Sequence, residues 1–428
     1  MRKIMISACL IAGMLAMTGC ADNTETSSSE NTSDTAASAV STEAESTETT
    51  EPTTQDPGPE SYTHGEEGYY NILEEFPDIE TPSQKGGTCW LYAAAMSMET
   101  AYAKENGSLI SIDPIELLDY GYGQDEGFIV KEGIDPMEIG GWQWIVTESL
   151  TSGFGDLTID GSVILDTSDR DAIKQNLHER GGVAIGVNDT DKRYKGWHGE
   201  YYTLNYTKAE FDHDITIIGY DDHFPKQYFN IPASEDGAWI CYNSSFGSAG
   251  YFYVSYCAPL EYGISHSVTD KYSEVLAYDA GNEQDRYIKT GERTTTANVF
   301  HKAGTLAAVG TYNDFDEQDI KIEIYDAGFK NLLYSQDAVL DYHGYHTVEL
   351  DTPVDVTDCA VSITYSKGAP VEGDDIDYGH ADYITDSESG QSFVRVNDSW
   401  KDMTDSDIMS VTGADFKPNN CCIKALFS

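Results

Sequence analysis

Three side chains of the sequence could together carry out nucleophilic chemistry: Cys89, His213 and Asn243. A cysteine thiol becomes a strong nucleophile when a nearby imidazole takes its proton, and a third polar group commonly holds that imidazole in orientation. Each residue alone says little about function. A single cysteine before a helix, for example, is most often a small buried side chain. The elements around the three residues therefore decide whether they can act together.

Cys89 is expected at the first turn of a helix. Two glycines and a threonine precede it, and residues 90–104 are rich in strong helix formers. The N-terminal end of a helix carries a partial positive charge, which stabilises a thiolate and lowers the pKa of a cysteine placed there. The sequence therefore predicts a reactive thiol at position 89.

His213 and Asn243 are expected at the ends of two strands. His213 begins an apolar, β-branched run that leads to Gly219, and a short apolar run ends at Asn243. A glycine-rich turn follows, and then a further strand over residues 251–256. Runs of this composition between turn residues are typical of buried strands. The pattern therefore places both polar side chains where a strand meets a loop.

The order of these motifs resembles the papain family of cysteine peptidases. The motifs are Gln84, Gly-Thr-Cys-Trp, Asp-His before an apolar strand and Gly-Tyr, Trp-x-x-x-Asn-Ser, and Gly-Tyr-Phe, within about residues 60–260. The resemblance implies that Cys89 is the nucleophile, His213 its base and Asn243 the residue that orients the imidazole. It also implies that the Gln84 side chain and the backbone N–H of Cys89 hold the oxyanion during acyl transfer.

Further segments agree with this resemblance. Gly140 and Gly141, which precede Trp142 and an apolar helix, resemble the glycine pair that lines the substrate cleft. Residues 171–187 resemble the helix and strand of the family's second half-domain. Residues 222–232 resemble an insertion found in exported bacterial and archaeal members, which also carry a C-terminal lectin-like domain.

The sequence departs from the family pattern in three places. Gln84 lies one residue closer to Cys89 than is usual, so the loop that would hold the oxyanion is shorter. The aromatic residue expected after Asn-Ser is replaced by Ser245 and Phe246. A glycine of the pair at 86–87 stands where the family has a half-cystine, so the local disulfide is absent. The residues that would set the cleavage preference are scattered, and the sequence does not predict it.

The acidic composition limits the partners of the chain. It has 74 Asp and Glu residues against 25 Lys and Arg residues, and its formal net charge is −49. Binding to nucleic acid or to an anionic membrane surface needs clustered cations, so neither partner is expected. Such a charge is typical of solubility in an extracellular setting. The expected chemistry requires no cofactor and no metal.

Residues 1–20 have the layout of a bacterial lipoprotein signal peptide. Arg2 and Lys3 precede a short apolar stretch, and a Met-Thr-Gly-Cys segment that resembles a lipobox ends at Cys20. We expect lipidation of Cys20 and a location on the extracellular face of the bacterial membrane, held by the lipid anchor alone. An ordinary signal peptide is the alternative. Residues 21–60, acidic and rich in Ser and Thr, are expected to form a disordered tether.

The region 270–428 is expected to form a β-sandwich. Short β-rich runs alternate there with turn residues, at 294–299, 306–311, 320–325, 345–350, 360–365, 392–396 and 422–427. Its closing Asn-Cys-Cys-Ile-Lys-Ala segment resembles the lectin-like domain named above. A cell-surface or glycan ligand and a purely structural spacer both remain open. A disulfide between Cys359 and Cys421 or Cys422 also remains open. The acidic run 372–378 could hold Ca²⁺, although it lacks the signature of a calcium-binding loop.

The sequence thus predicts an α+β fold, with a two-lobed papain-like domain over residues 61–265 and a lectin-like β-sandwich over residues 270–428. The expected activity is that of a cysteine endopeptidase acting on extracellular proteins or peptides. The alternative is a surface adhesin or carbohydrate-binding lipoprotein whose papain-like domain is inactive. We expect the C-terminal region to fold as a separate unit, and the competing expectation is that it packs on the peptidase and buries apolar surface from both.

Overall fold

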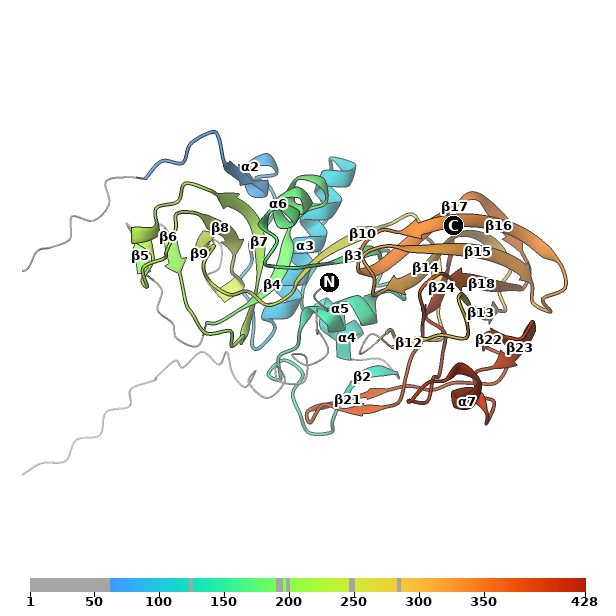
Figure 1. Ribbon diagram of the computed structural model, residues 1–428. Coiled ribbons are helices and arrows are strands. Elements are labelled where there is room, and N and C mark those ends of the chain that lie inside the picture. Colours follow the sequence, from blue (N-terminus) through green and yellow to red (C-terminus); the bar gives the residue numbers. More distant parts are fainter. Residues whose placement is uncertain (1–61, 123–125, 190–194, 198–200, 246–250, 283–285) are drawn as a thin grey trace, which may run out of the picture.

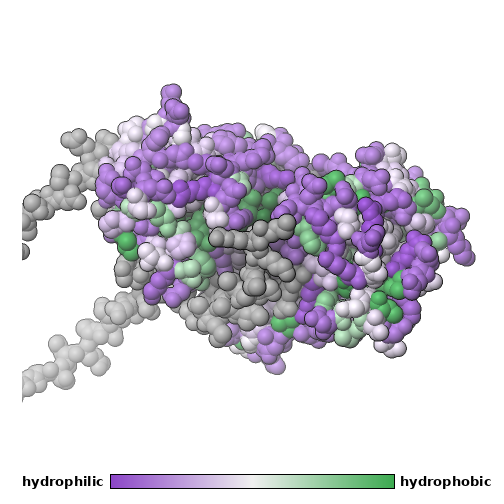
Figure 2. Space-filling model, in the orientation of Figure 1, coloured by the Kyte–Doolittle hydropathy of each residue, from purple (hydrophilic) through white to green (hydrophobic). Residues whose placement is uncertain are grey.

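The computed structural model describes most of the chain after the tether (Figure 1), namely residues 62–122, 126–189, 195–197, 201–245, 251–282 and 286–428. The predicted leader, the tether, Cys20 and Phe246 lie outside the described residues. Within these ranges no helix is both long and apolar enough to cross a membrane. The face shown in Figure 2 is mainly hydrophilic, with hydrophobic residues in small separate patches. This agrees with a chain whose net charge is −49.

The first half of the described chain has a helical lobe and a strand lobe, which confirms the predicted α+β class (Figure 1). Its helices and its first two strands are β1 (Tyr69–Asn71), α2 (Ile72–Glu75), α3 (Cys89–Asn106), α4 (Glu116–Tyr122), β2 (Gly127–Val130), α5 (Gln143–Leu150), α6 (Arg170–Glu179) and the 3₁₀ helix η2 (Lys226–Tyr228). Its other strands are β3 (Thr158–Leu165), β4 (Val183–Val187), β5 (Lys195–Trp197), β6 (Tyr201–Leu204), β7 (His213–Asp221), β8 (Ala238–Tyr242), β9 (Tyr251–Ser255) and β10 (Gly263–Thr269).

α3 is the helix that was predicted to begin at the candidate nucleophile. Fourteen of its 18 residues are buried, so neighbouring elements cover it on nearly all sides rather than along one stripe. Its many alanines suit this position, because small side chains let neighbouring elements pack close to a helix axis. The helix ends at Gly107, which has a φ of +63° and donates its N–H to the carbonyl oxygen of Ala103.

β7 is the central strand of the strand lobe. It pairs with β4 on one side and β8 on the other, both antiparallel, and the sheet continues through β9 to β6 and β5. The N-terminal strand β1 also pairs with β7. Eight of the nine residues of β7 are buried, which explains why its sequence is a nearly continuous apolar run rather than an alternating one.

The C-terminal region is rich in strands, as predicted. The elements are β11 (Glu274–Leu276), β12 (Tyr287–Ile288), β13 (Thr294–Phe300), β14 (Gly304–Asn313), β15 (Gln318–Asp326), β16 (Leu332–Leu340), β17 (Gly344–Val356), β18 (Cys359–Tyr365), β19 (Ala369–Pro370), β20 (Ile376–Asp377), β21 (Ala381–Ile384), β22 (Ser392–Val396), β23 (Ser399–Asp402), α7 (Ile408–Thr412) and β24 (Ile423–Phe427). One sheet has the order β16-β15-β18-β13-β22-β23, and β11, β24, β14 and β17 form the facing layer. The predicted β-rich runs lie in these strands, apart from Cys422, which precedes β24. The sequence missed β16, an edge strand whose residues are mostly exposed or half-buried.

The C-terminal cysteines are packed as thiols. Cys359, Cys421 and Cys422 are buried and free, so the disulfide left open by the sequence does not form. The Sγ of Cys421 donates to the carbonyl oxygen of Phe393, and that of Cys422 to the carbonyl oxygen of Gly281. These three side chains therefore act as small core residues.

One sheet runs through both halves of the molecule. β17 of the C-terminal region pairs with β3 of the papain-like region, and β3 pairs in turn with β10. A second connection joins β2 to β21. The predicted domain end at residue 265 falls inside β10, which belongs to the papain-like region through its pairing with β4. The C-terminal region is thus joined to the papain-like region by strand pairing, which agrees with the competing expectation that it packs on the peptidase.

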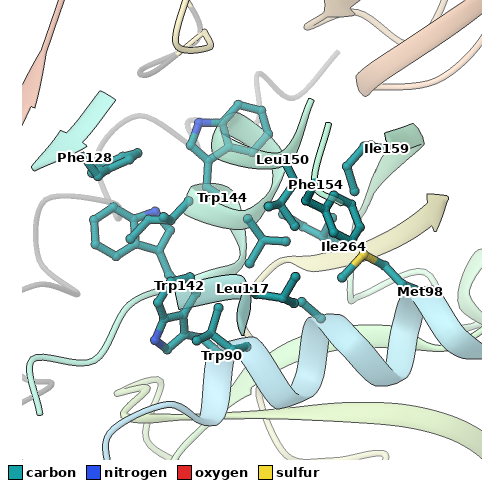
Figure 3. Packing of buried hydrophobic residues seen from close by; sticks show 14 of the residues in the cluster. Trp90, Met98, Leu117, Phe128, Trp142, Trp144, Leu150, Phe154, Ile159 and Ile264 are labelled. Atoms are coloured by element: carbon teal, nitrogen blue, oxygen red, sulfur yellow. The ribbon is translucent and has the colours of Figure 1, made fainter. Parts of the chain in front are cut away.

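The core also crosses between the two halves. Trp90, Trp142 and Ile145 of the papain-like region share one buried cluster with Tyr345 and Cys422 of the C-terminal region. Figure 3 shows the papain-like part of this cluster gathered beside α3. Apolar burial contributes about 25 cal/mol per Å², so separating the halves would expose surface that stabilises both.

Gly344, the first residue of β17, lies where the two halves pair, opposite Val163 of β3. Its φ is +130°, and a Cβ atom at this position would lie 1.7 Å from the carbonyl oxygen of Ser162 in β3. Gly379 also has a positive φ, +86°, but a Cβ atom there would have no atom within 4 Å. Substitution of either glycine would strain the backbone, but only substitution of Gly344 would also disturb the shared sheet. A comparison of the two substitutions therefore separates the two costs in stability.

We predict that Gly344→Ala lowers the free energy of unfolding by about 2 kcal/mol more than Gly379→Ala does, because only the first variant adds a clash between strands. Urea unfolding followed by tryptophan fluorescence measures both, since every tryptophan of the chain except Trp400 lies in the papain-like region. Equal destabilisation by the two variants would show that the junction between β3 and β17 does not hold the halves together.

Candidate active site

Side-chain contacts place the start of α3 beside the start of β7. The Thr216 hydroxyl on β7 donates to the carbonyl oxygen of Ala93 at 2.9 Å, one helical turn after Cys89. The Cys89 thiol contacts the backbone of Asp214, the residue that follows His213. The structure therefore brings the predicted nucleophile and the predicted base to the same place, although 124 positions separate them in the sequence.

The loop before Cys89 is held by glycines. The Gly87 N–H donates to the carbonyl oxygen of Met137 at 2.7 Å. Gly86 has a φ of +64°, and a Cβ atom there would lie 2.5 Å from the same oxygen. A residue with a Cβ atom at position 86 would collide with this oxygen, so the loop requires glycine there. This explains why the pair 86–87, where the family has a half-cystine, contains glycine.

The two predicted cleft glycines lie against the same helix. A Cβ atom on Gly141 would lie 2.4 Å from the indole ring of Trp90, so this glycine lets the 140–141 segment pass over the first turn of α3. Gly140 has a φ of +77°, and its carbonyl oxygen accepts a hydrogen bond from the Tyr122 hydroxyl at 2.9 Å. The Gln143 amide, at the start of α5, donates to the Trp90 carbonyl oxygen at 2.8 Å.

His213 and Asn243 form a direct hydrogen bond. The imidazole Nε2 lies 2.9 Å from the Oδ1 of Asn243, and both side chains are fully buried. The same Oδ1 accepts the backbone N–H of Ser245 at 2.9 Å. Because an amide oxygen only accepts, Nε2 carries the hydrogen in this bond, and Nδ1 of a neutral imidazole is left as the basic nitrogen.

Gln84 is tied to the segment that follows Asn243. Its backbone N–H donates to the Ser244 carbonyl oxygen at 3.0 Å, and its Oε1 accepts the Ser244 hydroxyl at 2.8 Å. Its Nε2 donates to the carbonyl oxygen of Gly86 at 2.9 Å. An amide nitrogen has two hydrogens, so this contact uses one of them. The shorter loop thus still brings Gln84 to the site.

Burial controls the electrostatics of the site. It raises the pKa of the Cys89 thiol to about 12, and the Asp214 carboxylate adds to that effect. The backbone N–H groups of Cys89 and Trp90 at the helix N-terminus do lower this pKa, as expected. The net shift is nevertheless upward, because the thiol is only 4% exposed and loses its hydration. Burial likewise raises the pKa of Asp214 to about 7, against the opposing effects of His213 and Gln143.

The sequence interpretation missed two acidic residues, Asp214, whose charge acts on the thiol, and Glu261, whose pKa is raised by the charge of Asp214. Asp214 carries a signal that could have revealed it, since it is an acidic residue inside an otherwise apolar strand, next to the candidate base. Glu261 carries no such signal, because it lies in a loop whose path the sequence does not define. In the described ranges no group of three or more His, Cys, Asp or Glu residues could hold a metal ion.

Comparison with protein families assigns both halves of the chain. Residues 80–272 match the papain family of cysteine proteases, and residues 277–427 match the lectin-like domain family. Over 216 residues the chain is 22% identical to the probable cysteine protease RD21C of Arabidopsis thaliana, a match that covers 44% of this chain and 45% of that protein. The chain thus spans less than half the length of this curated relative.

Solved structures agree with the order of the two halves. Clostridial cysteine protease Cwp84 after propeptide cleavage has a TM-score of 0.67 at 18% identity, covering 84% of this chain and 98% of that one. The cysteine protease and lectin-like domains of Cwp84, a surface-layer-associated protein of Clostridium difficile, have a TM-score of 0.68 at 17% identity, covering 86% and 89%. At such identities the likeness concerns the fold, and it includes both halves. The chain therefore contains a papain-family cysteine protease domain over residues 80–272, followed by a lectin-like domain over residues 277–427.

Proposed function

We propose that this chain is a cell-surface cysteine endopeptidase that hydrolyses peptide bonds of extracellular proteins or peptides through Cys89, His213 and Asn243. The observation that carries the proposal is the 2.9 Å bond between His213 and Asn243 beside a cysteine that begins a buried helix. That bond orients the imidazole and keeps the hydrogen on Nε2, so that Nδ1 of the neutral ring is the basic nitrogen. The family match supports the same assignment.

The first half of the proposed reaction forms an acyl-enzyme. The resting thiol is protonated, because burial raises its pKa to about 12. His213 takes the proton at Nδ1 as the sulfur attacks the carbonyl carbon of the substrate. The backbone N–H of Cys89 and the second N–H of the Gln84 amide hold the negative oxygen of the tetrahedral intermediate. The intermediate collapses when His213 gives its proton to the leaving amine.

The second half of the reaction releases the acid product. Water enters the place of the amine, gives a proton to His213 and attacks the carbonyl carbon of the thioester. The tetrahedral intermediate then expels the sulfur, which recovers the proton from His213. Asn243 holds the imidazole in one orientation through both halves, so the same nitrogen serves as base and acid.

The proposed location is the extracellular face of the membrane, through a lipid on Cys20 at the end of a lipoprotein-type leader. Cwp84 is a surface-layer-associated protein, and its similarity in fold supports a surface role here. The lectin-like domain would add a cell-surface or glycan ligand. The raised pKa of the Cys89 thiol is the one observation that favours the alternative, an adhesin with an inactive peptidase domain.

We predict that Cys89→Ala abolishes hydrolysis of a fluorogenic peptide library, and that Asn243→Ala lowers kcat/KM by about 100-fold or more, because the imidazole loses its orienting bond. Cys257→Ala is the matched control, since it removes a half-buried thiol that bonds Ser234 instead. Circular dichroism should show that all three variants are folded. A wild-type protein that cleaves no peptide under reducing conditions would support the adhesin alternative.

A second prediction concerns the thiol itself. Asp214→Asn removes a carboxylate that raises the pKa of Cys89, so the pKa should fall and alkylation by iodoacetamide at pH 7.5 should become severalfold faster. The measurement uses the Cys257→Ala background, and mass spectrometry follows the Cys89 peptide. Asp212→Asn, on the other side of His213, is the control and should leave the rate near that of the background. An unchanged or slower rate in Asp214→Asn would contradict the assigned effect.

A third prediction concerns the anchor. In a bacterial host that processes lipoproteins, the full chain should partition into the detergent phase of Triton X-114, and Cys20→Ser should move it to the aqueous phase. Mass spectrometry of the N-terminal peptide checks the acylated cysteine directly. An unmodified N-terminus at another residue would contradict lipidation and leave the peptidase proposal untouched.

A further inference from the structure

Asp214 is a buried carboxylate beside the nucleophile for which the reaction above has no use. It is the second residue of β7 and is 2% exposed. Successive side chains of a strand alternate between its faces, so Asp214 and Thr216 point the same way. Thr216 bonds the Ala93 carbonyl on α3. Asp214 therefore faces α3 one turn earlier, where it acts on the Cys89 thiol.

Glu261 brings a second carboxylate to the same place. Its backbone N–H donates to the carbonyl oxygen of Gly186 at 3.0 Å. A Cβ atom on Gly186 would lie 2.3 Å from the Oε2 of Glu261, so the carboxylate fills the space that this glycine leaves empty. Gly186 of β4 lies directly opposite Asp214 of β7 in the sheet. Cross-strand partners share a face, so the Glu261 carboxylate lies beside Asp214.

One oxygen atom of the Asp214–Glu261 carboxylate pair lacks a hydrogen bond among the described residues. The Oδ2 atom of Asp214 is buried and has no hydrogen-bond partner in the described part of the chain. Burial raises the pKa of Glu261 to about 8, and the charge of Asp214 adds to that rise. Two close carboxylates with an open acceptor are costly to bury unless a cation or a shared proton joins them. Glu261 is only half-buried, so the pair can be reached from its side.

We infer that Asp214 and Glu261 form an acidic subsite next to Cys89, which binds the guanidinium or ammonium group of an arginine or lysine side chain in the substrate. The inference rests on the proposed function, since the subsite belongs to the same site. A guanidinium group suits it well, because its several N–H donors can bond two carboxylates at once. A resident metal ion is a poorer occupant, because no group of three ligands exists among the described residues.

The test compares arginine with citrulline, its neutral isostere, at each of the two residues on the acyl side of the scissile bond. Wild-type protein should cleave the arginine peptide at one of these positions with a kcat/KM about tenfold higher or more. Glu261→Gln and Asp214→Asn should each reduce this ratio several-fold. The ratio within one variant cancels any general effect of Asp214 on the thiol. Glu235→Gln is the control, because Glu235 pairs with Arg170 on the surface and should leave the ratio unchanged.

A binding measurement separates failure of the subsite from failure of the proposed function. Calorimetric titration of the same peptides into Cys89→Ala protein needs no turnover, and arginine should bind more tightly than citrulline unless Glu261→Gln is also present. Such a preference without any hydrolysis by the wild type would support the subsite and count against the peptidase proposal. Equal hydrolysis and equal binding of both peptides would overturn the subsite.

Discussion

The packing of α3 against β7 is the contact on which the site depends. A helix is normally buried along one face, but α3 is covered on nearly all sides, so its position is set by both lobes and by the C-terminal region. The Thr216 bond to Ala93 sets the height of the helix along the strand. Because the first turn of the helix carries Cys89 and the first residue of the strand is His213, this one contact determines which chemical groups meet.

The same packing makes the lectin-like region part of the enzyme's architecture. β3 and β10 run through the middle of a sheet that begins in one half and ends in the other. A buried pair of opposite charge, Lys424 with Asp279 at 2.6 Å, lies in the C-terminal half, where Lys424 also sits over the ring of Tyr312, a member of the shared core. A ligand held by the lectin-like region would therefore be coupled to the peptidase by a rigid connection rather than by a flexible linker.

The site contains a conflict between solvation and chemistry. A thiol that must ionise is placed where burial and a neighbouring carboxylate both oppose ionisation. The arrangement makes sense if charge develops only when the substrate is bound, because a cationic side chain next to Asp214 would offset the carboxylate and ease formation of the thiolate. Substrate selection and activation of the nucleophile would then use the same carboxylates. This links the acidic subsite to the reaction itself, rather than to binding alone.

The sequence by itself determined the local elements that carry the candidate catalytic residues. Helix formers after Cys89, the apolar run after His213 and the short strand before Asn243 are local patterns, and local patterns suffice for elements that are buried or strongly periodic. Only the tertiary structure decided what depends on distant contacts: the sheet shared by β3 and β17, the thiols left unpaired, the raised pKa of Cys89 and the meeting of Asp214 with Glu261. A pKa follows from the solvent and charges around a group, and neighbours far apart in the chain set both.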